Sequence, residues 1–417
     1  MNDIKKEIIE LLLATTCIPN IIRAKKSYFL TLMWTLSLLI CSGYLYYLTI
    51  MSIKEYLKYR VITSIEVINE SPTLFPTVTI CNLNGYSEKN IQNETIISCL
   101  FNNNRCNLTH FKVINFTSYG NCLRFNDNPD DLQKTYLADK YAGSLLLELF
   151  SGIPKTKSND YFSMGYGFRI IINNQTDRIT RIVKGVDVAP GFQTNILVDR
   201  IFYFKETIPY ENCFSDFDSY YSNFDSEIVK EILNKGKIYQ QSYCFQKCYI
   251  KMLKTKCNCD SDPFNSFKCL NKEVNMSCFD IIHKYFYISN YTECLPLCPL
   301  ECNRQEFKLS TSLLNYPHLS EVESLLQNPI IKSKYENISN VTVSQLRESV
   351  VSVAIYYEDL SYTVVSKEPK MNFLDLISNI GGIMGIFLGI SFLSFLEIIE
   401  LIFMLFYSLI TQKDIFK

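Results

Sequence analysis

Two acidic residues lie inside a long apolar segment near the C-terminal end of the sequence. Glu397 and Glu400 are three residues apart, so a helix would place both carboxylates on one face. An acid within hydrocarbon is costly and generally faces a bundle interior or water, which favours a polar path through a membrane. The alternative is that both acids mark the end of the helix in the bilayer. It is less favoured because the apolar LIFMLFYSLI follows them.

Small residues precede these acids in the same segment. Gly382, Gly385 and Gly389 recur at helical spacing, and Ser391 follows. This stripe is typical of closely packed helices. It is equally typical of a helix that breaks and exposes backbone carbonyls and a hydroxyl to a water-filled path. The spacing alone leaves both interpretations open.

Two apolar segments would have to position these groups. Residues 28–50 carry no charge over 23 residues, which is enough to cross a hydrocarbon core of about 30 Å. Residues 373–410 are interrupted only by Asp375 and the two acids, and they are longer than one perpendicular span needs. The sequence therefore predicts a protein with two transmembrane helices.

Basic residues indicate the orientation of these spans. Arg23, Lys25 and Lys26 precede the first span and Lys413 follows the second, which predicts that both termini are cytoplasmic. We expect a multi-pass protein of the plasma membrane with this order: cytoplasmic 1–27, transmembrane 28–50, extracellular 51–371, transmembrane 372–410 and cytoplasmic 411–417.

Cysteines and glycosylation signals agree with an extracellular middle region. Of 16 cysteines, Cys17 and Cys41 lie in the first 50 residues, and the other 14 lie between Cys81 and Cys302. An even number on the oxidising side predicts seven disulfides and disfavours a zinc site. Nine N-x-S/T sequons lie in the same region: Asn69, Asn93, Asn107, Asn115, Asn174, Asn275, Asn290, Asn337 and Asn340.

Composition excludes several other classes of protein. The 417 residues have a formal net charge of -1 and are 47% hydrophobic, so neither a nucleic-acid binder nor a disordered chain is expected. The histidines, His110, His283 and His318, are scattered, and no hydrolase, zinc-protease or nucleotide-binding motif occurs. We expect no enzyme, no metal site and no cofactor.

Periodicity predicts a single α+β ectodomain. Alternation in LFPTVTICNLNG, YAGSLLLELF and GYGFRIIINN is typical of strands, and residues 348–369 look like two further strands. Helical spacing appears at 226–233 and 242–259, with a short helix expected at EVESLLQN. Disulfides should hold residues 213–302 together.

Six motifs occur in an order that resembles the degenerin, epithelial sodium channel and acid-sensing channel superfamily: FPTVTICNLN, GNCLRFN, VAPGFQTNI, CNC, CPLEC and GGIMGIFLGIS…LE. Members of that superfamily are trimeric, amiloride-sensitive, sodium-preferring cation channels with a large ectodomain on two spans per subunit. The resemblance implies the same architecture here, in a homotrimer or a heterotrimer with related subunits, with sodium as the permeant ion.

The resemblance also implies roles for particular residues. Gly389, Ile390 and Ser391 match the selectivity filter, and Glu397 and Glu400 match acids on its cytoplasmic side. The implied pore-lining residues are Asp375, Ser378, Asn379, Gly382, Gly385, Glu397 and Glu400. The implied disulfides are Cys81 with Cys122, Cys99 with Cys106, Cys213 with Cys302, Cys244 with Cys298, Cys248 with Cys294, Cys257 with Cys278, and Cys259 with Cys269.

Gating residues follow from the same resemblance. Tyr59 and Tyr210 fall where the family stacks two aromatic rings to couple the ectodomain to the pore, although ordinary interface or core aromatics explain them too. The family's cytoplasmic His-Gly pair, which supports opening, falls on Thr16 and Cys17. This departure predicts that the chain conducts poorly alone.

Other departures bear on the stimulus. Only 17 residues separate Cys81 from Cys99, where acid-sensing members carry a long insertion, and Arg60 and Val61 occupy the place of their proton-sensing histidines. We therefore expect gating by an extracellular ligand, an RFamide-type neuropeptide, and not by protons. An outer-pore acid of the family falls on Asn379, with Asp375 as a substitute one turn earlier.

Two alternatives stay open. The chain could be an accessory subunit that conducts only in heterotrimers, or a two-span receptor or adhesion protein with no pore. In each case the expected partners are membrane lipid and protein, with no nucleic acid.

Overall fold

The computed structural model describes residues 28–83, 94–116, 120–153, 165–177, 184–215, 226–234, 238–257, 278, 281–282, 284, 286, 292–335, 340–388 and 399. The chain divides into two compact units. We call residues 1–62 with 368–417 the helical unit, and residues 63–367 the sheet unit. Strands β1 (Val61–Asn69) and β16 (Val350–Pro369) cross the boundary between them in sequence.

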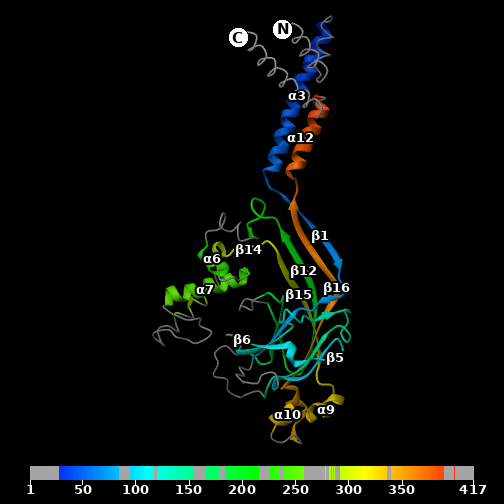
Figure 1. Ribbon diagram of the computed structural model, residues 1–417, viewed down its shortest axis with the longest axis vertical. Coiled ribbons are helices and arrows are strands. Elements are labelled where there is room, and N and C mark those ends of the chain that lie inside the picture. Colours follow the sequence, from blue (N-terminus) through cyan, green and yellow to red (C-terminus); the bar gives the residue numbers. More distant parts are fainter. Residues whose placement is uncertain are drawn as a thin grey trace, which may run out of the picture. The chain divides into compact units, whose positions relative to one another are not determined.

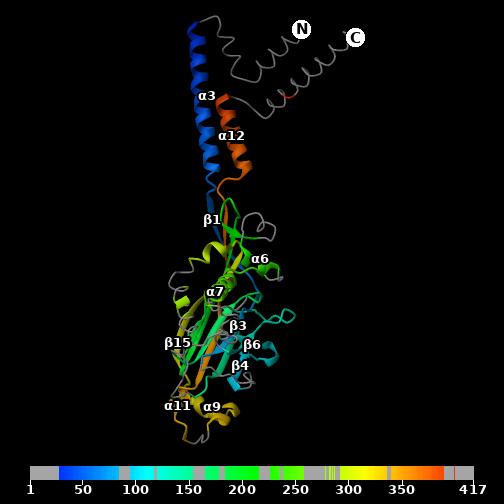
Figure 2. The same ribbon diagram turned by 90° about the vertical axis from the view of Figure 1, so that its left-hand side faces the viewer.

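Two helices run side by side in the helical unit (Figures 1 and 2). They are α3 (Tyr28–Tyr56) and α12 (Phe373–Leu388). Helix α3 extends six residues beyond the expected span, because no proline or glycine interrupts residues 51–56. Among the described residues, Thr31–Tyr56 is long and apolar enough to cross a membrane, and Phe373–Phe387 is a shorter apolar helix. The expected second span continues into residues that are not described.

The larger sheet of the sheet unit has seven strands. Their order is β15-β12-β16-β9-β4-β5, and β1 also pairs with β16 (Figure 1). Their bounds are β4 (Ile96–Phe101), β5 (Asn104–Arg105), β9 (Leu145–Phe150), β12 (Phe192–Lys205) and β15 (Arg304–Asn315). Strands β12 and β16 are parallel, whereas β12 with β15 and β16 with β9 are antiparallel.

The second sheet has five strands in the order β11-β10-β3-β7-β6. Their bounds are β3 (Thr77–Asn82), β6 (Phe111–Phe116), β7 (Gly120–Phe125), β10 (Phe168–Asn173) and β11 (Val186–Val188). Two small ladders join β2 (Thr73–Leu74) to β8 (Lys134–Thr135) and β13 (Cys213–Phe214) to β14 (Leu300–Glu301). These strands include the three predicted from LFPTVTICNLNG, YAGSLLLELF and GYGFRIIINN.

One strand prediction is wrong. Residues 348–369 were expected to form two strands, but β16 is a single strand of 20 residues. Its ladder with β12 shifts register between Val198 and Arg200, which pair with Tyr357 and Tyr362. The extra residues of β16 form a bulge there, and the exposed Glu358 and Asp359 within it resemble a turn in the sequence.

The main core contains apolar side chains from both sheets. Strand β3 is buried along its whole length, since it is paired on both sides within its own sheet. Phe75 is fully buried and makes edge contacts with Phe101, Phe125 and Tyr357, at ring-centroid distances of 5.1, 6.2 and 6.1 Å. Such aromatic pairs add to the stability that burial provides.

Two helical regions complete the sheet unit. Helices α6 (Glu227–Asn234) and α7 (Gln241–Cys257) match the expected 226–233 and 242–259 and form a second core with buried cysteines. Helices α9 (Val322–Gln327), α10 (Pro329–Lys334) and α11 (Val343–Arg347) form a third core with Phe150 and Tyr316. Short 3-10 turns are η2 (Leu108–His110), η3 (Leu295–Leu297) and η4 (Leu319–Glu321).

Candidate functional site

Helix α12 has two unlike faces over its described length. Leu376, Ile380, Ile383, Met384 and Phe387 are buried or partly buried. The opposite stripe is exposed and holds the expected pore-lining residues: Asp375, Ser378, Asn379, Gly382 and Gly385. The structure thus brings the described members of that predicted set onto one face of one helix.

The apolar face of α12 is the one paired with α3. The ring of Phe387 meets the ring of Tyr44 edge to face at 5.3 Å between centroids. The stripe of small and polar residues is therefore turned away from α3 and is free to face other chains or water.

Gly381 and Gly382 of α12 are not needed for this pairing. A Cβ added at Gly381 or Gly382 would meet no heavy atom within 4 Å, apart from its chain neighbours and the backbone of its own helix. The close-packing interpretation of the glycine stripe requires such neighbours. Within the described part of this chain, Gly382 therefore has no helix-packing role.

Asp375 caps the start of α12. Its carboxylate accepts a hydrogen bond from the Asn372 backbone N–H at 2.9 Å, and the Leu376 N–H bonds the Asn372 carbonyl at 3.0 Å. An acid in the first turn also interacts favourably with the positive end of the helix dipole. The carboxylate is fixed at the helix start and exposed, on the same stripe as Asn379.

Several predicted site residues lie outside the described residues. They are Thr16, Cys17, Gly389, Ile390, Ser391, Glu397, Glu400, Cys259, Cys269, Asn93, Asn275, Asn290 and Asn337. Their predicted roles stay predictions. The same is true of the stacking of Tyr59 on Tyr210, since Tyr59 belongs to the helical unit and Tyr210 to the sheet unit.

The remaining sequons are described in part. Asn69, Asn107 and Asn340 are exposed, and Asn174 is partly exposed. Asn115 lies in β6, and its side chain is outside the description. The Asn107 side chain caps η2 by accepting from the Thr109 N–H at 3.1 Å, and the Asn174 side chain accepts from the Gln175 N–H at 2.8 Å.

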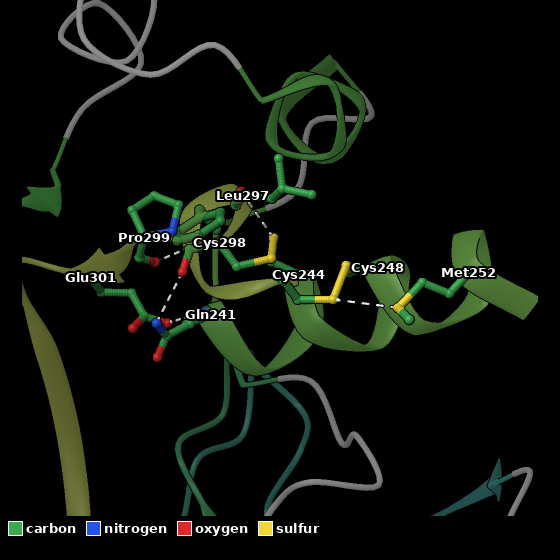
Figure 3. The surroundings of a disulfide bond; sticks show 10 residues. Gln241, Cys244, Cys248, Met252, Leu297, Cys298, Pro299 and Glu301 are labelled. Atoms are coloured by element: carbon green, nitrogen blue, oxygen red, sulfur yellow. Dashed lines mark hydrogen bonds between the residues drawn. A yellow bond between two sulfur atoms is a disulfide. The ribbon is translucent and has the colours of Figure 1, made fainter. Parts of the chain in front are cut away.

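The disulfides of the sheet unit follow the predicted order. Six of the seven expected pairs are present: Cys81–Cys122, Cys99–Cys106, Cys213–Cys302, Cys244–Cys298, Cys248–Cys294 and Cys257–Cys278. Cys244 and Cys248 are one helical turn apart on α7, so both reach the 294–298 segment from the same face (Figure 3). Cys41 is a free thiol in α3.

A partly buried carboxylate binds the start of α7. Glu301 accepts a hydrogen bond from the Gln241 backbone N–H at 2.5 Å, and the Gln241 side chain donates to the Cys298 carbonyl at 3.0 Å (Figure 3). Asp177 accepts from the Gln240 side chain at 2.7 Å. Burial raises the pKa of both carboxyl groups above their usual values, because it disfavours the charged form.

A cavity of about 590 Å³ lies beside α7, between α6 and η3. Ile228, Met252 and Leu297 contribute apolar lining. Charged groups also line it, where Lys251 pairs with Glu227 at 2.7 Å and Lys256 with Glu293 at 3.5 Å. Its volume is within the range of small-ligand sites.

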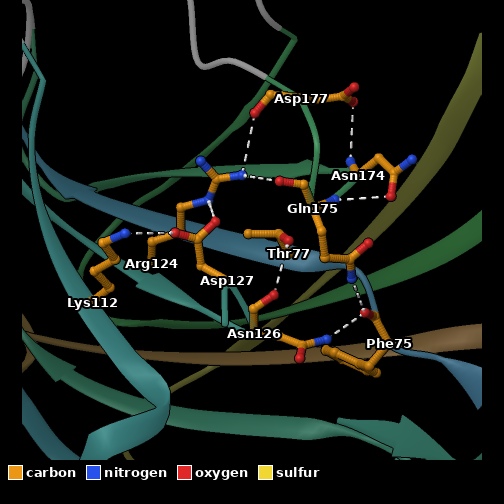
Figure 4. A network of polar contacts seen from close by, with 9 residues as sticks. All are labelled: Phe75, Thr77, Lys112, Arg124, Asn126, Asp127, Asn174, Gln175 and Asp177. Atoms are coloured by element: carbon orange, nitrogen blue, oxygen red, sulfur yellow. Dashed lines mark hydrogen bonds and ion pairs between the residues drawn. The ribbon is translucent and has the colours of Figure 1, made fainter. Parts of the chain in front are cut away.

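The GNCLRFN motif stabilises the fold of the sheet unit. Arg124 of GNCLRFN pairs with Asp127 at 3.0 Å and donates to the Asp177 carbonyl at 3.2 Å (Figure 4). Asn126 adopts a left-handed conformation, φ 61°, which asparagine tolerates well. Its amide donates to the Phe75 carbonyl at 2.6 Å and accepts from the Gln133 N–H at 2.7 Å. The motif therefore joins three chain segments around β3.

Gly191 of the VAPGFQTNI motif also joins separate chain segments of the sheet unit. Its φ is +82°, which disfavours any residue with a Cβ. Its N–H donates to the Val350 carbonyl at 2.9 Å, and its carbonyl accepts from the Tyr316 N–H at 2.9 Å. The glycine thus joins the starts of β12 and β16 to the end of β15.

Two charged groups of the sheet unit were missed by sequence reasoning. Arg200 of β12 pairs with Glu70 at 2.5 Å. Glu211 pairs with Lys205 of β12 at 3.3 Å and also with Lys367 of β16. Glu70 and Arg200 are 130 residues apart and Glu211 and Lys367 are 156 residues apart, so no local spacing identifies these two pairs. The signal that the sequence offered was a charged residue, Arg200, within the largely apolar run ILVDRIFYF.

The sequence matches the family model described as amiloride-sensitive sodium channel over residues 13–95 and 87–401. It is 26% identical over 305 residues to epithelial sodium channel subunit gamma-2 of Xenopus laevis, covering 72% of this chain and 43% of that protein. It is 24% identical over 315 residues to epithelial sodium channel subunit beta of Mus musculus, covering 73% and 46%. The chain thus spans less than half the length of these relatives.

One solved structure is similar only at a low level. It is the cryo-EM structure of a proton-activated chloride channel, with a TM-score of 0.37, 8% identity, and coverage of 90% of this chain and 98% of that one.

Proposed function

The chain belongs to the amiloride-sensitive sodium channel family, and from this membership we propose that it is a subunit of an amiloride-sensitive, sodium-permeable cation channel of the plasma membrane. The observation that carries the proposal is the exposed stripe of α12, which gathers Asp375, Asn379 and Gly382 on the face turned away from α3. Polar and small residues on a membrane helix are costly unless they face water or protein.

In an assembly of three subunits, the exposed stripe of α12 would line the ion path. Three copies of α12 around one axis would line a path with these residues and leave the apolar faces packed on α3. The filter at Gly389, Ile390 and Ser391 would follow toward the cytoplasm. Glu397 and Glu400 would then add six carboxylates in a homotrimer, which attract cations and repel anions.

The proposed stimulus is an extracellular ligand, an RFamide-type neuropeptide. Supporting it are the short segment of 17 residues between Cys81 and Cys99 and the substitution of Arg60 and Val61 at the proton-sensing position. Arg60 pairs with Glu55 at 3.1 Å, and neither Arg60 nor Val61 carries an imidazole. Proton gating through this position is therefore not expected.

Expression in oocytes under voltage clamp tests the proposal. RFamide-type peptides should evoke an inward sodium current that amiloride blocks, and a step to acid pH should not. Ser391→Cys should make that current sensitive to aqueous thiol reagents. A peptide-evoked current that is insensitive to thiol block at this site would contradict the filter assignment, and silence toward peptides with a constitutive current would contradict the stimulus.

A second candidate function is an accessory subunit of a heterotrimer. The observation favouring it is Thr16 and Cys17 at the place of the family's His-Gly pair. Co-expression with a related subunit should then give a current larger than that subunit alone, and the Ser391→Cys variant should confer thiol block on it. If Ser391→Cys never reacts in either setting, the non-conducting receptor alternative is favoured.

A further inference from the structure

A cluster of cations lies where α3 ends, entirely within the helical unit. One carboxylate, Glu55, holds three of them. Its oxygens lie 3.0 Å from the Lys58 Nζ, 3.1 Å from an Arg60 guanidinium nitrogen and 3.2 Å from the Lys370 Nζ. We call these four residues the entry cluster.

Backbone bonding fixes the entry cluster although its members come from two chain segments. The Lys370 N–H donates to the Arg60 carbonyl at 2.8 Å, and the Leu57 N–H bonds the Ile53 carbonyl at 2.9 Å. The cations are therefore held together by the fold and not only by their attraction to Glu55.

The entry cluster is strongly positive and open to solvent. Three cations and one carboxylate give the cluster itself a net charge of two positive units. Of the charged residues that adjoin it in sequence, Lys54 and Glu368 offset each other and Asp375 adds one negative charge. The side chains of Lys58, Arg60 and Lys370 are 52%, 55% and 47% exposed, while that of Glu55 is 25% exposed. Each of these cations carries several N–H donors, and about half of each side chain is open to solvent.

Apolar side chains directly precede these cations. Thr31–Tyr56 is the membrane-crossing candidate, and near its end Met51 and Ile53 are 48% and 38% exposed. The exposed apolar side chains precede the cations at the end of this helix. This order matches a phospholipid, whose acyl chains would contact the apolar side chains and whose charged headgroup would contact the cations.

We propose that the entry cluster binds the phosphate of an anionic phospholipid headgroup, with an acyl chain along Met51 and Ile53. Arg60 supplies a planar fork suited to two phosphate oxygens, and Lys58 and Lys370 supply point charges. Glu55 pairs with all three cations and offsets one unit of their charge.

Native mass spectrometry of the full-length protein in detergent measures the binding. Three probes are added in turn: phosphatidylglycerol, phosphatidylcholine, and a diacylglycerol that lacks phosphate. Wild type should bind phosphatidylglycerol more tightly than phosphatidylcholine, and diacylglycerol least. Each cation near a membrane surface contributes about fivefold, so Lys58→Gln with Arg60→Gln should weaken phosphatidylglycerol binding about 25-fold.

A matched control removes two lysines elsewhere. Lys308→Gln with Lys332→Gln changes the same net charge at exposed positions of the sheet unit and should leave lipid binding unchanged. Equal binding in the Lys58/Arg60 variant and wild type would overturn the proposal, as would diacylglycerol binding as tightly as phosphatidylglycerol. Displacement of the lipid by inorganic phosphate at equal concentration would assign the cluster to a soluble anion instead.

Glu55→Gln gives a test of opposite sign. Loss of the internal carboxylate raises the net charge by one unit, so phosphatidylglycerol should bind about fivefold more tightly. Because this variant gains binding where a misfolded protein would lose it, a result in the predicted direction excludes a folding artefact. A loss as large as that of the double variant would contradict the proposal.

Discussion

The Arg200 guanidinium lies 2.5 Å from the Glu70 carboxylate, and its side chain is only 5% exposed whereas that of Glu70 is 42% exposed. Arg200 also lies over the rings of Tyr357 and Tyr362, at 5.3 Å from each centroid. Both tyrosines flank the bulge of β16. Arg200 of β12 therefore contacts both Glu70, which follows β1, and the two tyrosines beside the bulge of β16.

Removal of this charge should destabilise the sheet unit. Arg200→Met loses the ion pair and both cation–ring contacts, which we expect to cost about 2 kcal/mol because Glu70 can still reach water. Tm of the full-length protein in detergent should fall by about 4–8 °C. Arg200→Lys keeps the charge without the planar stacking and should recover only part of the loss. Full recovery by lysine would contradict the role of the rings.

Glu211 should make stability fall in acid. Hydrogen bonding from Lys367, with the charge of Lys205, holds the pKa of this carboxyl below its usual value of 4.5. A depressed pKa contributes stability that is present above the unfolded-state value and is lost as pH falls through the folded-state value. Thermal unfolding of Glu211→Gln should differ from wild type at about pH 6 and converge with it near about pH 3. A constant difference would contradict this assignment.

Glu301 should change the pH dependence of stability in the opposite direction to Glu211. Burial raises the pKa of its carboxyl above 4.5, so the folded state binds its proton at higher pH than the unfolded state. Its effect on stability therefore becomes more favourable as pH falls through the folded-state pKa, until the unfolded state is protonated too. Glu301→Gln keeps an acceptor for the Gln241 N–H and should flatten this part of the profile. Identical pH profiles of unfolding in Glu301→Gln and wild type would contradict the prediction.

The pair Thr16 and Cys17 gives a prediction about current. Thr16→His with Cys17→Gly restores the family's residues and, if the departure limits opening, should raise homomeric current several-fold at equal surface expression. Thr16→Ser with Cys17→Ser is the matched control that restores neither. Voltage clamp with surface biotinylation separates opening from trafficking, and an unchanged current per surface channel would argue against the accessory-subunit idea.

Local patterns in the sequence predicted some of the elements, including α6, α7 and α9, and one face of α12. They did not predict the long strands β12 and β15, and they failed where long-range contacts decide. Period-two alternation identified β3, β9 and β10, and helical periodicity placed Asp375 and Asn379 on one stripe. Periodicity could not identify the pairing of Arg200 with Glu70, 130 residues away, or that of Lys370 with Glu55, 315 residues away. Disulfide partners likewise followed from resemblance to a family and not from cysteine spacing.

Asn379 offers a direct test of the exposed stripe of α12. Asn379→Asp adds a carboxylate on the face that also holds Asp375, so each subunit would raise the local sodium concentration at the mouth of the proposed pore. Single-channel sodium conductance should rise about twofold, most clearly at low salt because the attraction is screened. Asn379→Lys should lower it, and the neutral Asn379→Gln should leave it near wild type. Equal conductance in the aspartate and lysine variants would show that this stripe does not face the ion path.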